Sequence, residues 1–414
     1  MARKRHLLAG IDVGTTKICS VIASIEEGKV RIPGIGWSDS KGLKKGIVVN
    51  LTETVDSVRK SLDQAETEAR AVVDSAFVSV GGIHIQGLNA SGRTELRDQN
   101  SEITEEDIAR VIDEAKSLEL PEHYEVIHAL TQDFTVDGQG DILNPLGLTG
   151  QSLSVNLHLV LNAAAAVQNI VNAVNKAGVV VNGVVMQQLA SAEAVLTEDE
   201  KELGVIVVDI GGGTTDVAFY RRSSIWHSAV LPIGGDLITK DIAIGLKVPL
   251  QEAEQLKKDT GNMFPESIAD EEMLEISEVG TGRRSTISRR LLCQIIQARS
   301  EEILNAIGEI VEEVRMRKDL MTGVVITGGG SQLDGLLDRA EQMLAMPVRM
   351  GYPINPDSTE ERPFDPAYAT ALGLLRYGKE MQNGMGSNGS RSVLARRPKA
   401  TTERLKDWVL GRIG

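Results

Sequence analysis

The chain has 414 residues. Single hydrophobic cores stop growing at roughly 250–300 residues, so two or more domains are expected. An apolar content of 42% and a charged content of 25% fit a globular protein. The net charge of -14 argues against a nucleic-acid binder, which would carry a basic footprint.

The cysteines and the apolar runs indicate the compartment. Cys19 and Cys293 are the only cysteines, too few for a zinc cluster and too far apart to suggest a disulfide framework. No apolar run approaches the roughly 18–20 residues of a spanning helix. The basic N-terminus, residues 1–6, leads into a strand and not into a signal-peptide core. We expect a cytoplasmic protein whose membrane contact, if any, is peripheral.

Two segments of the chain resemble each other. Residues 7–25 read LLAGIDVGTTKICSVIASI, and residues 205–220 read VIVVDIGGGTTDVAFY. Each consists of a β-branched strand, an Asp, a glycine turn, a Thr-Thr pair and a second strand, which predicts a hairpin. Two copies about 200 residues apart suggest a duplicated chain with one copy in each half.

Helices are predicted between these hairpins. Val167, Ile170, Val171 and Val174 have helical spacing, and Gly178 is placed to end that helix. In residues 101–118, a helix start at Thr104 and Asp107 precedes a buried stripe of Ile108, Val111, Ile112 and Ala115. A strand is predicted over 126–136, so residues 82–160 read as a small inserted α+β unit.

A third glycine-rich turn, Gly328-Gly329-Gly330, follows an apolar strand and precedes a helix expected to begin near Gln332. From Met381 the composition shifts to Gly, Ser, Asn and then Arg, which indicates a flexible linker to about Ala400.

The glycine turns are candidate phosphate sites. A phosphate needs several N–H donors aimed at one point, and consecutive glycines allow this close backbone approach. The first hairpin offers Gly14, Thr15, Thr16 and Lys17, and the second offers Gly211, Gly212, Gly213, Thr214 and Thr215. Asp12 and Asp209 are expected at strand ends facing the same cleft, where two carboxylates suit a Mg²⁺ that keeps several waters.

Any single turn of this kind is more simply an ordinary hairpin that needs glycine for its shape. Three such turns, two of them with Asp before the glycines and Thr-Thr after them, favour a phosphate site. The third turn is expected to approach a nucleoside, with Gln332 close by. Neither the Walker pattern nor an opening G-x-G-x-x-G is present, which disfavours P-loop and Rossmann proteins.

The order of these motifs resembles the actin/Hsp70/sugar-kinase superfamily. Within it, the chain is similar to the FtsA family of bacterial actin-like cell-division proteins, with further support from residues 196–204 and 369–378. The resemblance covers nearly all of residues 6–380 and the tail. It implies an α/β, actin-like ATPase fold, with two RNase H-like halves around a nucleotide cleft and an inserted α+β subdomain.

The resemblance also implies a domain order. The expected segments are the start of the first half at 1–81, the inserted subdomain at 82–160, the first half continued with the connecting helix at 161–195, the start of the second half at 196–233, a small subdomain on the nucleoside side at 234–300, the end of the second half at 301–358, a closing helix at 359–380, a linker at 381–400 and a membrane-targeting helix at 401–414.

The implied cofactors are ATP and Mg²⁺. The resemblance places Gly234, Gly235 and a helix carrying Glu254 and Lys257 on the nucleoside side, although the residues alone favour a simple turn and a solvated helix face. Many ATP-hydrolysing relatives carry a Glu in the segment joining the halves, where this chain reads MQQLA from Met186. Because Gln can orient a water but cannot take its proton, we expect slow or no hydrolysis.

The C-terminal tail has amphipathic spacing. Leu405, Trp408, Val409 and Ile413 fall on one helical face, and from Arg391 on seven basic residues outnumber two acidic ones. This pattern is typical of an interfacial helix attracted to anionic lipid. Its residues alone equally allow a helix docked on the body, and the preceding linker and the resemblance favour the anchor. One tail should bind weakly, so polymerisation should strengthen attachment.

A group of arginines lies in residues 283–299, around an apolar helix. Such a run is usually a solvated face. In FtsA-like proteins this subdomain receives the C-terminal peptide of FtsZ, so the resemblance makes Arg284, Arg290 and Arg299 the candidate partner site.

The resulting expectation is a membrane-tethering, self-polymerising adaptor of FtsZ filaments at the division site, on the inner face of the cytoplasmic membrane, that helps recruit later division proteins. A chaperone-type ATPase like Hsp70 is disfavoured because no peptide-binding domain follows residue 380. A small-molecule kinase has no use for an amphipathic tail. A pilus-type actin-like adaptor stays open, and FtsZ-peptide binding would separate it.

Overall fold

The computed structural model describes residues 6–26, 29–96, 101–280, 282–315, 322–354 and 364–384. The chain forms two compact units. One comprises Met1–Ala90, Leu118–Gln132 and Leu157–Tyr377, and the other comprises Ser91–Ser117, Asp133–Asn156 and Gly378–Gly414.

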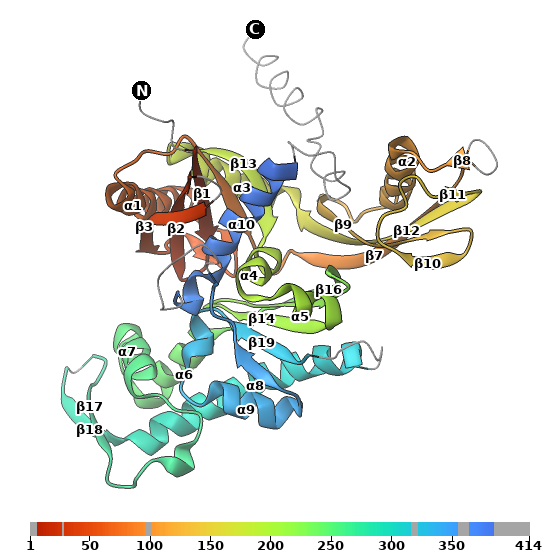
Figure 1. The fold of residues 1–414 in the computed structure, drawn as a ribbon. Coiled ribbons are helices and arrows are strands. Elements are labelled where there is room, and N and C mark those ends of the chain that lie inside the picture. The colour runs from red at the N-terminus through yellow and green to blue at the C-terminus, as the bar shows by residue number, and fades with distance from the viewer. Residues whose placement is uncertain are drawn as a thin grey trace. The chain divides into compact units, whose positions relative to one another are not determined.

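The first half of the larger unit is built on a five-stranded sheet (Figure 1). Its order is β13-β6-β1-β2-β3. Strands β1 (His6–Val13), β2 (Lys17–Glu26) and β3 (Lys29–Asp39) form an antiparallel meander, which confirms the first predicted hairpin. Strands β6 (Ser75–Val80) and β13 (Val180–Met186) add in parallel.

Helices α1 (Leu51–Ala69) and α3 (Ala164–Lys176) complete the core of the first half. The predicted stripe of α3 is confirmed, because Val167, Ile170 and Val174 are buried. Gly178 follows the helix with a φ of +107°, a conformation that favours glycine and ends the helix there.

The second half repeats this topology. Its sheet order is β16-β15-β14-β19-β20. Strands β14 (Val205–Ile210), β15 (Thr215–Arg221) and β16 (Ser224–Leu231) form the meander, and β19 (Val324–Thr327) and β20 (Val348–Met350) add in parallel. The same order and the same strand directions in both sheets confirm the predicted duplication.

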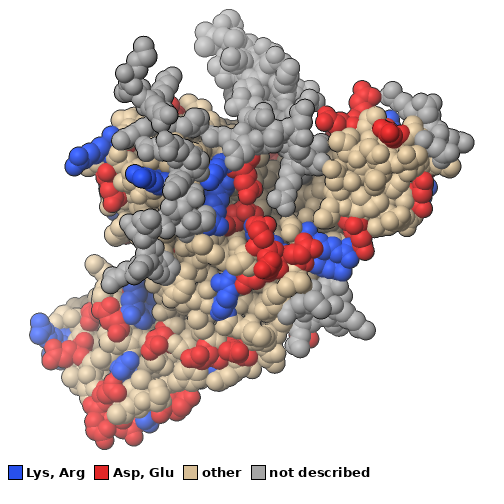
Figure 2. Space-filling view, in the orientation of Figure 1, with Lys and Arg blue, Asp and Glu red and all other residues tan. Residues whose placement is uncertain are grey.

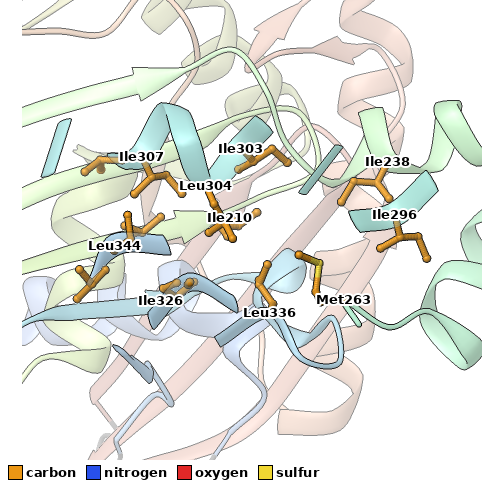
Figure 3. Close-up of a cluster of buried hydrophobic side chains, with 14 of the residues drawn as sticks. Ile210, Ile238, Met263, Ile296, Ile303, Leu304, Ile307, Ile326, Leu336 and Leu344 are labelled. Atoms are coloured by element: carbon orange, nitrogen blue, oxygen red, sulfur yellow. The ribbon is translucent and has the colours of Figure 1, made fainter. Parts of the chain in front are cut away.

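The core of the second half lies between this sheet and its helices (Figure 3). The helices are α6 (Gly235–Leu246), α7 (Leu250–Thr260), α8 (Arg289–Arg315) and α9 (Leu336–Leu344), with a hairpin of β17 (Met273–Ser277) and β18 (Arg284–Ser288). Ile210 and Ile326 of the sheet pack with Ile296, Ile303 and Leu304, all buried. This core fixes the strand ends on which the site is built.

The expected helix near Gln332 was placed too early. After β19, residues Gly329–Gln332 form a short 3₁₀ turn, and α9 begins only at Leu336. Gly335, with a φ of +78°, separates the two, so a continuous helix from Gln332 is interrupted.

Two helices connect the halves: α4 (Gln187–Val195) and α10 (Ala369–Gly384). A Cβ on Gly373 would lie 1.7 Å from the Ala190 carbonyl oxygen, so a glycine is required where these helices meet. A short helix, α5 (Glu198–Leu203), leads from α4 into β14. The linker predicted from Met381 starts too early, because α10 continues through Gly384. The rest of the linker and the predicted tail helix lie outside the described residues.

The inserted segment contains a four-stranded sheet ordered β10-β9-β12-β7. The strands are β7 (Gln86–Glu95), β9 (Tyr124–Val136), β10 (Gln139–Ile142) and β12 (Ser152–Ala163). Helix α2 (Glu105–Lys116) has the predicted capping box, in which Thr104 and Asp107 satisfy each other's backbone amides. Its predicted stripe is buried as well. No helix in the described part of the chain combines the length and the apolar character needed to cross a bilayer.

Candidate functional site

The two predicted phosphate turns face each other across the halves. A Cβ on Gly212 would lie 1.7 Å from the Thr16 Oγ1, and one on Gly213 would lie 2.8 Å from the Thr15 side chain. Thr16 Oγ1 also donates a hydrogen bond of 3.1 Å to Asp236 Oδ1. Residues separated by about 200 positions therefore meet at one point, and only glycine fits in the second turn.

The second turn also holds the start of helix α6. The amides of Gly235 and Asp236 donate to the carbonyls of Gly211 and Gly212, both at 2.9 Å. A Cβ on Gly234, the residue before the helix, would lie 2.6 Å from both carbonyl oxygens. A helix N-terminus carries partial positive charge, so this arrangement favours an anion beside the turns.

Asp12 lies at the end of β1 as predicted and is buried. Its Oδ1 accepts hydrogen bonds from Ser79 Oγ at 2.7 Å and from Gln187 Nε2 at 3.3 Å. Burial raises the pKa of this carboxyl. Gln187 is the first residue of α4, so the connecting segment brings an amide and not a carboxylate to this position.

Asp209 is the second-last residue of β14 in the second half and lies against the third turn. Burial, and then the charge of Asp12, raise its pKa to about 6. Thr370 Oγ1 donates to Asp209 Oδ2 at 3.1 Å. Gly328 has a φ of +86°, and a Cβ there would lie 2.2 Å from Asp209 Oδ1, so both space and backbone conformation require glycine.

Asp216 is a site residue that the sequence prediction missed. It pairs with Asp209 across the second hairpin, is buried, and has its pKa raised to about 8 by burial and then by the charge of Asp209. Thr214 Oγ1 donates to its Oδ2 at 3.1 Å, whereas its Oδ1 has no hydrogen-bond partner among the described residues. The sequence did carry a signal for Asp216. Asp209 and Asp216 stand symmetrically about the glycine turn, so a hairpin there pairs the two residues.

Burial makes all three carboxyls costly to ionise, and the charge of Asp12 adds to that cost for Asp209 and Asp216. A cation beside them would lower it. Within the described residues, no three His, Cys, Asp or Glu side chains form a direct metal-ligating group. Mg²⁺ commonly keeps several of its waters and touches a site through one or two carboxylates. Asp12 and Asp209 fit that mode of binding.

The remaining residues of the first two turns have structural partners. The Lys17 ammonium donates to the Ala367 carbonyl at 2.6 Å and lies 4.2 Å from the centroid of the Tyr368 ring. It therefore points toward the segment before α10. Thr15 Oγ1 accepts from the Gly46 amide at 3.0 Å, and Thr215 Oγ1 donates to the Ile233 carbonyl at 2.9 Å.

The residues expected on the nucleoside side are brought together in the second half. Lys257 Nζ donates to the Gly235 carbonyl at 3.1 Å and pairs with Glu254 Oε2 at 2.6 Å. The Lys257 side chain is only 14% exposed, so it is not the solvated face that its residues alone favoured. Gln332 Nε2 donates to Asp365 Oδ1 at 2.9 Å, and Gly329 and Gly330 lie in the 3₁₀ turn between Gly328 and Gln332.

The candidate partner arginines lie on two elements, strand β18 and helix α8. Arg284 on β18 is 83% exposed, with Glu275 at 3.8 Å. Arg290 and Arg299 on α8 pair with Asp270 at 2.5 Å and with Asp241 at 2.6 Å. Figure 2 shows acidic and basic side chains interspersed over the visible surface of the described residues. The predicted membrane residues Leu405, Trp408, Val409 and Ile413 lie outside the described residues.

Solved structures share this fold. The PilM–PilN type IV pilus biogenesis complex matches with a TM-score of 0.64 at 17% identity, covering 90% of this chain and 99% of that one. MreB5 of Spiroplasma citri bound to ADP matches with a TM-score of 0.55 at 13% identity, covering 93% and 99%. The duplicated sheets and facing turns thus define a protein of the actin-like ATPase fold class.

Sequence relatives give the family. A family model described as "Cell division protein FtsA" matches residues 206–373, and one described as "SHS2 domain inserted in FTSA" matches residues 82–161. The cell division protein FtsA of Pseudomonas aeruginosa is 38% identical over 410 residues, covering 98% of each chain. That of Escherichia coli K12 is 34% identical over 416 residues, covering 99% and 97%. The chain belongs to the FtsA family of cell-division proteins.

Proposed function

We propose that this protein binds Mg-ATP between its two halves and acts as a nucleotide-gated adaptor in cell division. The observation that carries the proposal is the meeting of the two glycine-threonine turns above Asp12 and Asp209. Solved structures of MreB5, which share the fold, are bound to ADP and to AMPPNP.

In the proposed complex, backbone amides of both turns bind the phosphates, and the positive end of the α6 dipole favours their charge. Asp12 and Asp209 hold Mg²⁺ through its waters, and the metal offsets the charge of the phosphates when bound. Glu254 and Lys257, already paired at 2.6 Å, contact the nucleoside side together with Gly234 and Gly235. Gly328, Gly329, Gly330 and Gln332 approach the nucleoside from the third turn.

Gln187 sets the proposed rate of hydrolysis. Its amide is 3.3 Å from Asp12, at the segment that joins the halves. An amide orients water without accepting a proton, so bound ATP is hydrolysed slowly. The bound nucleotide then regulates assembly, and rapid turnover is not its purpose. A turnover number in the ordinary enzyme range, roughly 1–10³ per second, would contradict this part of the proposal.

Calorimetric titration with Mg-ATP tests the site. Gly212→Ala puts a methyl group 1.7 Å from Thr16 Oγ1, between the turns, so we expect affinity to fall by at least about tenfold. Gly308→Ala is the matched control, since its Cβ would meet only Leu344 at an ordinary 3.5 Å. Equal affinity of the two variants would reject the proposed site.

The adaptor function rests on the tail and on assembly. The proposed anchor, residues 401–414, holds the protein peripherally on the inner face of the cytoplasmic membrane at the division site. Neighbouring subunits of a filament add their tails at high effective concentration, which strengthens a weak single contact. The assembled protein tethers FtsZ filaments and helps recruit later division proteins.

The proposed FtsZ contact uses Arg284, Arg290 and Arg299. Carboxylates of the FtsZ C-terminal peptide would replace Asp270 and Asp241 as partners of Arg290 and Arg299. We expect Arg299→Ala to weaken binding of a synthetic FtsZ C-terminal peptide, measured by fluorescence anisotropy, about tenfold. Unchanged binding would exclude Arg299, and no peptide binding by the unaltered protein would favour a pilus-type adaptor.

A further inference from the structure

Strand β16 is the edge strand of the second sheet, and its free side is covered by side chains from the other half. Asn89 Nδ2 donates to the Trp226 carbonyl at 3.1 Å, and Gln132 Nε2 donates to the Ile225 carbonyl at 3.1 Å. Gln188 Nε2 reaches the Ala229 carbonyl at 3.4 Å. Three side-chain amides thus donate to three carbonyls of the edge strand, those of Ile225, Trp226 and Ala229, which an uncovered edge would leave unpaired.

A buried histidine completes this contact. His158 Nε2 lies 2.8 Å from Ser228 Oγ, and His158 Nδ1 lies 2.7 Å from Asn89 Oδ1. Gln132 Nε2 is also 3.2 Å from Asn89 Oδ1, so the side chains form one network. We call these contacts the β16 seam. It consists of the network of Asn89, Gln132 and His158, together with Gln188, all against β16.

The first-half members of the seam come from the roots of the inserted segment and from the connecting helix. Asn89 lies on β7, Gln132 on β9 and His158 on β12, whereas Gln188 lies on α4 next to Gln187. Gln132, His158 and Ser228 are 2–5% exposed. If these side chains moved apart and no water entered, their buried polar groups would lose their hydrogen bonds. The hydrogen bonds of the seam are therefore either all kept or all replaced by bonds to water.

The other end of β16 leads directly into the proposed nucleotide site. Leu231, the last residue of β16, pairs with Thr215 of the second turn. Two residues later, the Ile233 carbonyl accepts from Thr215 Oγ1 at 2.9 Å, and Gly234 then opens helix α6. A shift of the second turn is therefore transmitted along a short, hydrogen-bonded strand to the seam.

We infer that the β16 seam couples nucleotide binding in the cleft between the halves to the stability of β7, β9 and β12 where these strands carry Asn89, Gln132 and His158. The inference rests on the proposed nucleotide site. With nucleotide holding the halves together, the seam is closed; without it, rotation of the halves opens the seam and loosens the base of the inserted segment. The nucleotide shifts the equilibrium because it binds the arrangement with the closed seam more tightly than the arrangement with the open seam.

Hydrogen exchange of the full chain, with and without Mg-ATP, tests the coupling. In the unaltered protein we expect Mg-ATP to slow exchange at residues 86–90, 157–162 and 224–231 by at least about fivefold. Ser228→Ala should abolish the slowing at 86–90 and 157–162 while keeping it at the turn, 211–215. Gln132→Leu, which removes two donors of the same network, should do the same if Ser228→Ala folds poorly.

Ser20→Ala is the matched control. It removes a buried hydroxyl pair of the same 2.8 Å length, Ser20 with Ser61, that lies wholly within the first half. The control should respond to Mg-ATP as the unaltered protein does.

Calorimetry on the same samples separates the proposed coupling from the proposed nucleotide site. If Mg-ATP binds but exchange at the seam does not change, or Ser228→Ala behaves like Ser20→Ala, the coupling is rejected and the nucleotide site stands. If Mg-ATP does not bind, the proposed function fails, and the coupling with it.

Discussion

At the scale of single residues, the cleft is marked by three buried carboxyl groups whose ionisation is costly. Asp12, Asp209 and Asp216 are all buried, and the pKa of each is raised above its ordinary value. Their position at strand ends places them where a ligand's cation would offset them. A cation bound beside these carboxyls would lower the cost of ionising them, and that cost depends on pH.

The first prediction concerns Asp216. A carboxyl whose pKa rises from 3.8 to about 8 on folding binds more protons in the folded state than in the unfolded state between those values. Stability should therefore fall as pH rises from about 4 to 8, and Asp216→Asn should flatten that fall. The thermal unfolding midpoint of nucleotide-free protein at pH 5 and at pH 7.5 measures this. Exposed Asp56→Asn is the control. An unchanged pH dependence in Asp216→Asn would show that this carboxyl ionises freely.

The second prediction concerns Gln187. Replacing it with Glu introduces a proton acceptor at the position that contacts Asp12. General-base catalysis typically contributes 10²–10⁴-fold, so we expect Gln187→Glu to raise single-turnover ATP hydrolysis by at least about tenfold. Gln188→Glu is the comparison, because Gln188 contacts the Ala229 carbonyl and not Asp12. If neither variant hydrolyses faster, Gln187 is not next to the reacting water.

Sequence alone predicted where the candidate residues lie in the fold better than where their side chains point. The aspartates and glycines of all three turns lie where their motifs placed them, because a hairpin is determined by local sequence. The direction of Lys17 was not predictable, since its partner Ala367 lies 350 positions away. The burial of Lys257 likewise depends on the packing of α7 against the start of α6.

At the scale of elements, local signals predicted the helices whose ends are fixed locally. Helix α2 begins at Thr104 because a Thr and an Asp three residues later satisfy two free amides. The third turn was different. Gly335 and the approach of Gly328 to Asp209 impose a 3₁₀ turn at Gln332, where a helix was expected to begin.

The third prediction concerns the start of helix α2. Thr104→Ala removes the side chain that accepts from the Asp107 amide, which typically costs about 1 kcal/mol. We expect hydrogen exchange in α2 to accelerate by about fivefold. Glu114→Ala, on the exposed face of the same helix, should change exchange by less than about twofold. Equal effects of the two substitutions would mean that the cap does not stabilise α2.

At the scale of the whole molecule, the duplicated sheets, the inserted segment and the family membership agree with the account drawn from the sequence. The seam at β16 could not be predicted, because its contacts join residues that lie far apart in the sequence, such as Asn89 and Trp226, which are 137 positions apart. Long-range polar contacts of this kind depend on the finished fold and leave no local signal.

The central claim is that nucleotide binding and membrane attachment belong to one mechanism. Flotation with anionic vesicles, with and without Mg-ATP, tests it most directly, comparing the full chain with one that ends at Ala400. The account predicts that only the full chain floats and that Mg-ATP increases the floating fraction. If both forms float equally, or neither floats, the tail is not the anchor and the adaptor function is contradicted.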